Sequence, residues 1–145
     1  MIFIFLFLYL SCMKTNHAKL IQNYDAAAIL PLFSKLLPAA YINQLVAKSR
    51  KQFYKRIFTP TVLLWCLIYQ RLSKDHTQDE VIAHVKSGAA DHLSPDAQRP
   101  ISKRLKSEST AAYSKGQQRF PLSVLKETLS YTAKMVQQTV ARWHD

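Results

Sequence analysis

Thr59-Pro-Thr-Val-Leu-Leu-Trp-Cys-Leu-Ile-Tyr-Gln-Arg-Leu72 is the stretch of this 145-residue chain that decides the fold. Thr59 and Pro60 predict a helix start, because a threonine hydroxyl accepts from first-turn N–H groups and proline fits the first helical position. From Val62 to Leu72 the apolar side chains cover nearly every face of that helix, which is typical of a buried helix. A membrane span needs roughly 20 apolar residues, so this length indicates a core helix. Burying its larger side chains, at roughly 1.5–3 kcal/mol each, makes it the main hydrophobic anchor of the fold.

Helical periodicity continues on the N-terminal side of this anchor. Asp25 is suited to cap a helix over residues 26–37, although the proline at position 31 is tolerable only near its first turn. Pro38 opens a second helix that is predicted to run through Ala47. The chain has only two glycines and weak strand signals. The prediction is therefore an all-α fold, a compact multi-helix domain over residues 13–145.

A capping box marks the next helix on the C-terminal side. In Thr77-Gln-Asp-Glu80 the hydroxyl and the carboxylate are each expected to accept from the other residue's backbone N–H. Gly88 is the expected stop. The pattern then breaks down from Ala89 to Ser107, where a short helix over residues 101–106 is predicted.

The last segment predicts a long amphipathic helix that Pro121 opens. Apolar residues follow one another at steps of three and four, and we expect this stripe to face the core. Its members are Leu122, Leu125, Leu129, Ala133, Val136, Val140 and Trp143.

The charge balance is strongly basic, with 20 Lys and Arg against 9 Asp and Glu and a formal net charge of +11. Such an excess favours a polyanionic partner, either nucleic acid or an acidic membrane surface. Residues 48–56 carry five cations with two aromatic residues between them. They are either a phosphate-contacting strip that uses Lys51, Lys55 and Arg56 or a solvated connector whose aromatic rings dock on the core.

A second basic stretch, residues 99–106, offers Arg99, Lys103 and Arg104 for phosphate contacts. Between it and Pro121 lies the candidate DNA-reading helix, predicted over residues 109–120 with Ser109 as its cap.

At 100° per residue, this reading helix presents two different faces. Tyr113, Gly116 and Phe120 share the side that is expected to face the core. Amide side chains pair with adenine and cationic ones with guanine, so the opposite side is suited to the major groove. The side chains on or beside that opposite face are Ser114, Lys115, Gln118 and Arg119. A helix-turn-helix protein presents such a face to the major groove, so a helix-turn-helix-like element is expected in the fold.

The sequence predicts no metal site and no cofactor. Cys12 and Cys66 give no disulfide framework, and Cys66 is expected to be a small core residue. His84 and His92 are too far apart to share a helix face, and neither pairs with a cysteine at zinc-ligand spacing.

The first twelve residues differ from the rest, because Met1 to Leu10 is an unbroken apolar run. It is too short to span a bilayer as a helix and lacks the basic region that precedes a signal peptide core. One interpretation is a start assigned too early, with Met13 as the true start. The other is a membrane-directing segment.

Two sequence blocks resemble the N-terminal region of the insertion-sequence-four family of DDE transposases. The first is Phe58-Thr-Pro60 with the following Trp65, and the second runs from Ser109 to Pro121. The resemblance covers about Leu30 to Trp143. Many members carry Ala-Arg where this chain has Gly116-Gln117, and this difference predicts a lost cation, an added flexible residue and a reduced affinity for DNA.

What the resemblance implies is a prokaryotic, cytoplasmic, nucleoid-associated protein that binds double-stranded transposon-end DNA. Catalysis in the family belongs to a following RNase H-like domain whose carboxylates hold divalent metal. This chain ends at Asp145, about where such a domain would begin, and its acidic residues are few and scattered. We therefore expect no enzymatic activity.

Two other functions stay open at this point. The chain could be a small basic membrane-associated protein that residues 1–12 anchor, although the length of that segment makes a membrane the weaker prediction. It could also be an interaction or inhibitory fragment that pairs with full-length transposase, or with itself, through its last helix.

Overall fold

The computed structural model describes residues 26–53 and 56–144, and every regular element within these ranges is a helix. The all-α prediction is therefore confirmed for the described part of the chain. Residues 1–12 and Lys55, which carried predictions, lie outside it. The elements are α3 (Ala26–Leu36), α4 (Ala39–Lys48), α5 (Pro60–Leu72), α6 (Gln78–Lys86), the 3-10 helix η1 (Asp91–Leu93), α7 (Ile101–Arg104), α8 (Ala111–Arg119) and α9 (Leu122–His144).

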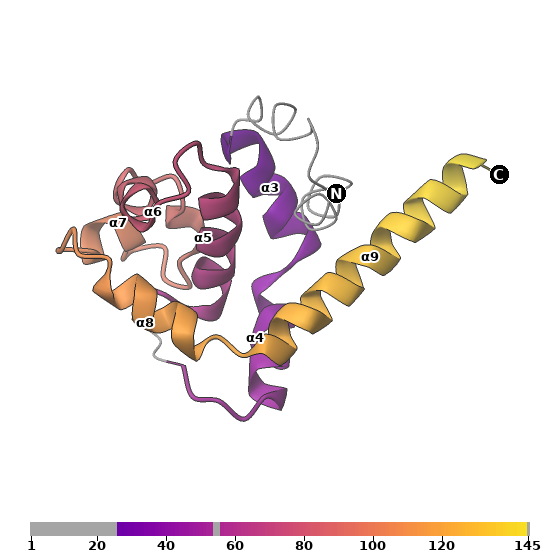
Figure 1. Ribbon diagram of the computed structural model, residues 1–145, viewed down its shortest axis with the longest axis horizontal. Helices are drawn as coiled ribbons and strands as arrows, with labels where there is room; N and C mark the ends of the chain where they lie inside the picture. Colours follow the sequence, from indigo (N-terminus) through magenta and orange to yellow (C-terminus); the bar gives the residue numbers. More distant parts are fainter. Residues whose placement is uncertain (1–25, 54–55, 145) are drawn as a thin grey trace.

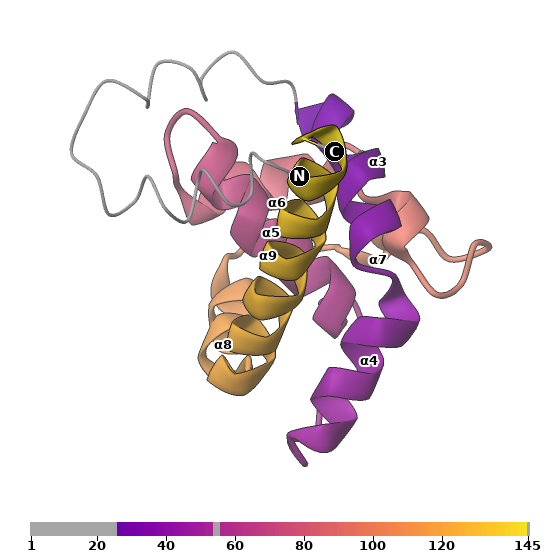
Figure 2. The same ribbon diagram turned by 90° about the vertical axis from the view of Figure 1, so that its right-hand side faces the viewer.

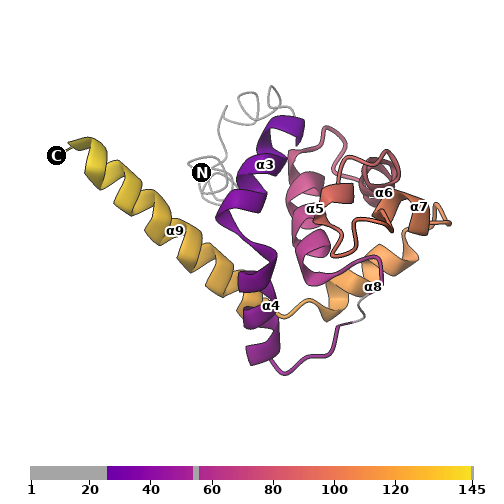
Figure 3. The ribbon, with the colours of Figure 1, turned by 180° about the vertical axis from the view of Figure 1, so that it is seen from behind.

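Helix α5 lies at the centre of the fold, where α3, α4, α6 and α8 pack on it (Figure 1). The first turns of α9 lie against α4 and close to the end of α8, as two perpendicular views show (Figures 1 and 2). The later turns of α9 extend away from the other helices (Figure 3). The predicted long C-terminal helix is thus confirmed.

The anchor helix begins as its sequence predicts. Thr59 is the N-cap, and its hydroxyl accepts from the backbone N–H of Val62 at 3.4 Å. The seven residues from Pro60 to Cys66 are all buried. The prediction of a helix buried on nearly every face is wrong for the remaining turns, because Leu67, Ile68 and Leu72 are only half-buried. Helices α3 and α9 do not close completely over that end of α5, and a groove remains between them.

Helices α3 and α4 lie within about one residue of their predicted bounds. Pro31 lies in the interior of α3 rather than near its first turn, and it is exposed. The helix persists because Leu30 and Phe33, the neighbours of this proline on the other face, are buried in the core. Pro38 is the N-cap of α4 rather than its first residue.

Half of the predicted capping box of α6 is present. The Thr77 hydroxyl accepts from the N–H of Glu80 at 3.2 Å, as predicted. The Glu80 carboxylate accepts from the N–H of Asp75 at 3.3 Å, and not from that of Thr77 as predicted. The chain before the helix turns at His76, whose φ of 56° brings the Asp75 N–H toward the carboxylate. Gly88, with φ of 88°, follows the end of α6 as expected.

The irregular stretch after α6 is held by one carboxylate. Asp91 accepts from the backbone N–H of Ser102 at 2.8 Å and from its hydroxyl at 2.6 Å, which ties η1 to the first turn of α7. The helix predicted over 101–106 is present but ends at Arg104.

Helices α8 and α9 are separated only by Phe120 and Pro121. The helix-turn-helix-like element stays a prediction. Thr110, rather than Ser109, is the N-cap of α8. The Ser109 hydroxyl nevertheless accepts from the N–H of Ala111 at 3.2 Å.

The prediction of the inward face of α9 is wrong, because the buried face is rotated by about one residue from the predicted apolar stripe. The buried line is Val124, Thr128 and Thr132, whereas Leu122 is 63 % exposed and Leu125 is half-buried. Both threonines fit this face because their hydroxyls donate to carbonyls of the preceding turn, at 2.9 Å and 3.0 Å. Beyond Thr132, no side chain that the structure describes in α9 is buried.

Candidate nucleic-acid interface

Helix α8 presents the two faces that its sequence predicts. Tyr113 and Phe120 are buried, whereas Lys115, Gln118 and Arg119 are exposed. Ser114 lies at the margin and is half-buried. The rotation of α8 about its axis is therefore as predicted.

A network of amide and hydroxyl groups fixes this rotation. The hydroxyl of Tyr113 donates to Gln70 Oε1 at 2.9 Å, and Gln117 Nε2 donates to the same oxygen at 3.1 Å. Gln78 Nε2 in turn donates to Gln117 Oε1 at 2.9 Å. Side chains of α5 and α6 thus hold α8 at two of its turns. Burial raises the pKa of the Tyr113 phenol well above its usual value, so this hydroxyl remains a donor.

The pair Gly116-Gln117 has a different role from the one predicted. A Cβ at Gly116 would lie 3.0 Å from Cδ1 of Leu63, so glycine here lets α8 approach α5 closely. Gln117 belongs to the network that faces α5 and α6 rather than to the exposed face. Both residues thus lie on the side of α8 toward the core, and the reduced affinity for DNA stays a prediction.

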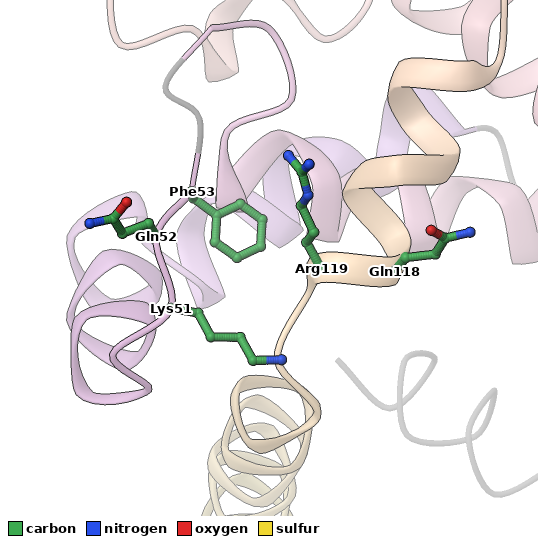
Figure 4. Close-up of a pocket in the computed structure, with 5 residues that line it drawn as sticks. All are labelled: Lys51, Gln52, Phe53, Gln118 and Arg119. Atoms are coloured by element: carbon green, nitrogen blue, oxygen red, sulfur yellow. The ribbon is translucent and has the colours of Figure 1, made fainter.

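A concavity of about 490 Å³ joins the exposed end of α8 to the first basic stretch. Lys51, Gln52 and Phe53 line it from one side, and Gln118 and Arg119 line it from the other. Figure 4 shows the Phe53 ring directed toward α8, the Arg119 side chain rising beside it and the Lys51 side chain below, while Gln52 and Gln118 point outward. Phe53 packs edge-on against Phe120, with ring centroids 5.8 Å apart. Phe53 docks on the core, as the connector alternative predicts, and Lys51 is exposed. The phosphate-contacting strip stays a prediction.

The second basic stretch contacts the first outside this concavity, at Arg56. The Arg104 guanidinium donates to the backbone carbonyl of Arg56, so these two predicted residues are neighbours. Lys103 is exposed on α7. Arg99 joins neither group, because it lies in the loop before α7 and pairs with Asp96 at 3.8 Å.

The residues that orient α8 were not among those predicted from the sequence. Gln70 is the one amide in an otherwise largely apolar helix α5, and that isolation is the signal that could have marked it. The three glutamines of the network are Gln70, Gln78 and Gln117.

A second polar contact in the core joins Trp65 to His84. Trp65 Nε1 donates to His84 Nε2 at 3.0 Å, and Tyr69 stacks on the same imidazole with centroids 3.7 Å apart. Burial lowers the pKa of His84, which keeps the accepting nitrogen unprotonated, while the nearby Glu80 carboxylate opposes the shift.

Within residues 26–53 and 56–144, no three His, Cys, Asp or Glu side chains form a group that could bind a metal ion. Cys66 is fully buried, as predicted, and burial raises the pKa of its thiol. None of the described helices is by itself long and apolar enough to cross a membrane, and only α3 with α4, bent by 59°, qualifies as a pair.

The chain matches no protein-family model, and neither a curated protein nor a solved structure was found to be similar to it. The resemblance to transposases therefore stays a prediction.

Proposed function

We propose that this protein binds double-stranded DNA through the exposed face of α8. The observation that carries the proposal is the concavity that Lys51, from the first basic stretch, lines together with Gln118 and Arg119 of α8. A cation from a distant segment thereby shares a surface with an exposed amide, on a helix whose rotation is held by hydrogen bonds to Gln70 of α5. DNA-binding proteins combine these two kinds of contact, phosphate contacts that position and base contacts that specify.

In this mechanism α8 enters the major groove, which is about 12 Å wide and admits one helix. Lys115 and Gln118, one turn apart on the exposed face, meet base edges. Lys51 and Arg119 contact phosphates on one side, and Arg56 and Lys103 extend the basic surface. The net charge of +11 favours the encounter at long range.

The target that we propose is transposon-end DNA, on the strength of the two sequence blocks that resemble the transposase family. The proposal assigns no strand cleavage to this chain. To test this, the protein is incubated with transposon-end DNA and magnesium or manganese, and we expect no nicking of the DNA. Nicking that disappears in an Asp75→Asn variant would contradict this part of the proposal.

The phosphate contacts are tested by the salt dependence of binding. Replacing Lys51 and Arg56 together by alanine should flatten the plot of log K against log salt by about 1.8, since each phosphate contact contributes roughly 0.9. The matched control replaces Lys35, an exposed cation of α3. Fluorescence anisotropy with labelled duplex DNA gives both slopes. Equal slopes for the double variant and the control would mean that the strip is only a connector.

Base reading is tested at Gln118. If its amide pairs with a base, Gln118→Ala lowers discrimination between end DNA and an unrelated duplex by about 1–3 kcal/mol. Stability should change by less than about 0.5 kcal/mol, because the side chain is exposed. Gln44→Ala, at an exposed position of α4, is the control. Unchanged discrimination would limit the protein to binding DNA without reading its sequence.

A further inference from the structure

An apolar groove of about 350 Å³ lies between α3, α5 and α9. Its walls include Ile29 and Leu37 from α3, Ile68 from α5, and Leu125 and Leu129 from α9. It shares no lining residue with the concavity beside α8, so it is separate from the proposed DNA-binding surface. Its volume lies within the range of about 300–1,000 Å³ of small-molecule sites, which occur between the helices of bundles.

The interior of the groove is suited to a hydrocarbon. Its described lining residues are aliphatic except for two threonines and two cations. The hydroxyls of Thr128 and Thr132 are already used, because they donate to carbonyls of their own helix at 2.9 Å and 3.0 Å. An occupant with a polar body would lose its hydrogen bonds to water here and find none in exchange. An alkyl chain loses nothing and gains from leaving water.

The charged side chains of the groove are suited to an anion. Arg71 from α5 and Lys126 from α9 both line it, and both are exposed. Within residues 26–53 and 56–144, neither cation forms an ion pair with an acidic side chain. The described lining residues include no Asp or Glu. A guanidinium and an ammonium group are the usual partners of a carboxylate.

We propose that this groove binds a fatty acid, a single-chain anionic amphiphile, with its alkyl chain along the leucines and isoleucines and its carboxylate at Arg71 and Lys126. Such a ligand covers apolar surface that the fold leaves in water, since Leu122 is 63 % exposed and Leu67 is half-buried. A second copy of the chain is a poorer occupant, because each copy carries a net charge of +11 that opposes association. A neutral hydrocarbon would leave both cations unused.

The alkyl chain is tested by isothermal titration calorimetry of the full chain with octanoate, decanoate and laurate below their micelle concentrations. We expect one site per chain, and each added pair of methylenes should tighten binding by about tenfold, which is roughly the effect of burying two methylenes. A basic surface that merely attracts anions would give many equivalent sites, or equal affinities for the three ligands. Either result would overturn the proposal.

The carboxylate contact is tested with Arg71→Gln combined with Lys126→Gln. The unmodified protein should bind laurate at least about tenfold more tightly than dodecyltrimethylammonium, a cation of the same chain length, and this double variant should lose most of that preference. Lys35→Gln with Lys48→Gln removes the same charge from exposed positions outside the groove and should keep the preference. Equal preferences in the two double variants would overturn the proposal.

The apolar wall is tested with Leu122→Asp, which removes an exposed leucine from the groove and adds a charge that repels the carboxylate. Laurate binding should weaken by about tenfold or more. Leu32→Asp is the matched control, at a leucine that is 47 % exposed on α3 and does not line the groove, and it should bind laurate as the unmodified protein does. Urea denaturation checks that both variants are folded. Equal affinities of the two variants would place laurate elsewhere and overturn the proposal.

Phosphatidylcholine vesicles separate a free fatty acid from a bilayer as the occupant. We expect no co-sedimentation of the full chain that depends on the groove, because the groove lies between helices and admits a single chain. Co-sedimentation that Leu122→Asp abolishes and Leu32→Asp retains would assign the groove to a membrane surface and overturn the proposal.

Discussion

Gln70 is the residue whose replacement tests the orientation of α8 most directly. Its Oε1 accepts from Tyr113 and from Gln117, and its Nε2 donates to the carbonyl of His76 at 2.9 Å. Gln70→Met keeps the length and most of the volume of the side chain and removes all three hydrogen bonds. The variant therefore changes hydrogen bonding with little change in packing.

The expected cost follows from the burial of each partner. Tyr113 is 0 % exposed, so its hydroxyl is left without an acceptor, at about 1–3 kcal/mol. Gln117 keeps its bond with Gln78, and the lost bonds to Gln117 and His76 add about 0.5–1.5 kcal/mol in total. Gln70→Met should thus lower the free energy of unfolding by about 1.5–4.5 kcal/mol.

A double-mutant cycle separates the hydrogen bond from general packing. Tyr113→Phe alone should cost about 0.5–1.5 kcal/mol, because Gln70 Oε1 keeps its bond with Gln117. In the Gln70→Met variant the same change should cost nothing or stabilise, since it removes an unpaired hydroxyl. The coupling energy should therefore be about 1 kcal/mol or more, within the range found for residues in contact.

Urea denaturation followed by circular dichroism and by the fluorescence of buried Trp65 measures all four proteins. Gln44→Met, at an exposed position of α4, is the control and should change stability by less than about 0.5 kcal/mol. If Tyr113→Phe costs the same with and without Gln70, the network does not hold α8, and the rotation of the proposed reading face has another origin.

Three further predictions concern other parts of the fold. Gly116→Ala should lower stability by up to about 2 kcal/mol in a chemical melt, because crowding against Leu63 outweighs the gain of about 1 kcal/mol in helix propensity; a stabilised variant would contradict the close contact of α8 with α5. Because burial lowers the pKa of His84, the unfolded state binds its proton first on acidification, so stability should fall as the pH drops below about 6.5. His84→Gln should weaken this dependence, and melts of both proteins across that pH range check it. Residues 13–145 expressed alone should keep a cooperative thermal transition, because the helices from α3 to α9 supply the buried core residues; loss of the transition would make residues 1–12 part of the core.

Local interactions explain what was predictable from the sequence. Thr59 and Pro60 begin α5, Thr77 caps α6, and Gly88 follows its end, because each signal acts within one turn of its own helix. The two faces of α8 were predictable for the same reason. Tyr113 and Phe120 are its large apolar residues, and only one rotation buries both.

The sequence could not decide the rotation of α9 or the partner of Glu80. Helix α9 has apolar residues on more than one face, and packing on α4, including the contact of Tyr41 with Tyr131 at 4.5 Å, selects the face that carries Thr128 and Thr132. The two threonine hydroxyls are satisfied within the helix, so a polar residue type did not prevent burial.

The sequence by itself determined the all-helical class, the starts of α5 and α6 and the polar and apolar faces of α8, because periodicity and capping are properties of neighbouring residues. Only the tertiary structure placed Lys51 beside Arg119, joined Gln70 to Tyr113, and left a groove between α5 and α9. These features unite segments that are far apart along the chain. The packing of helices on one another decides such meetings, and no local pattern of residues encodes them.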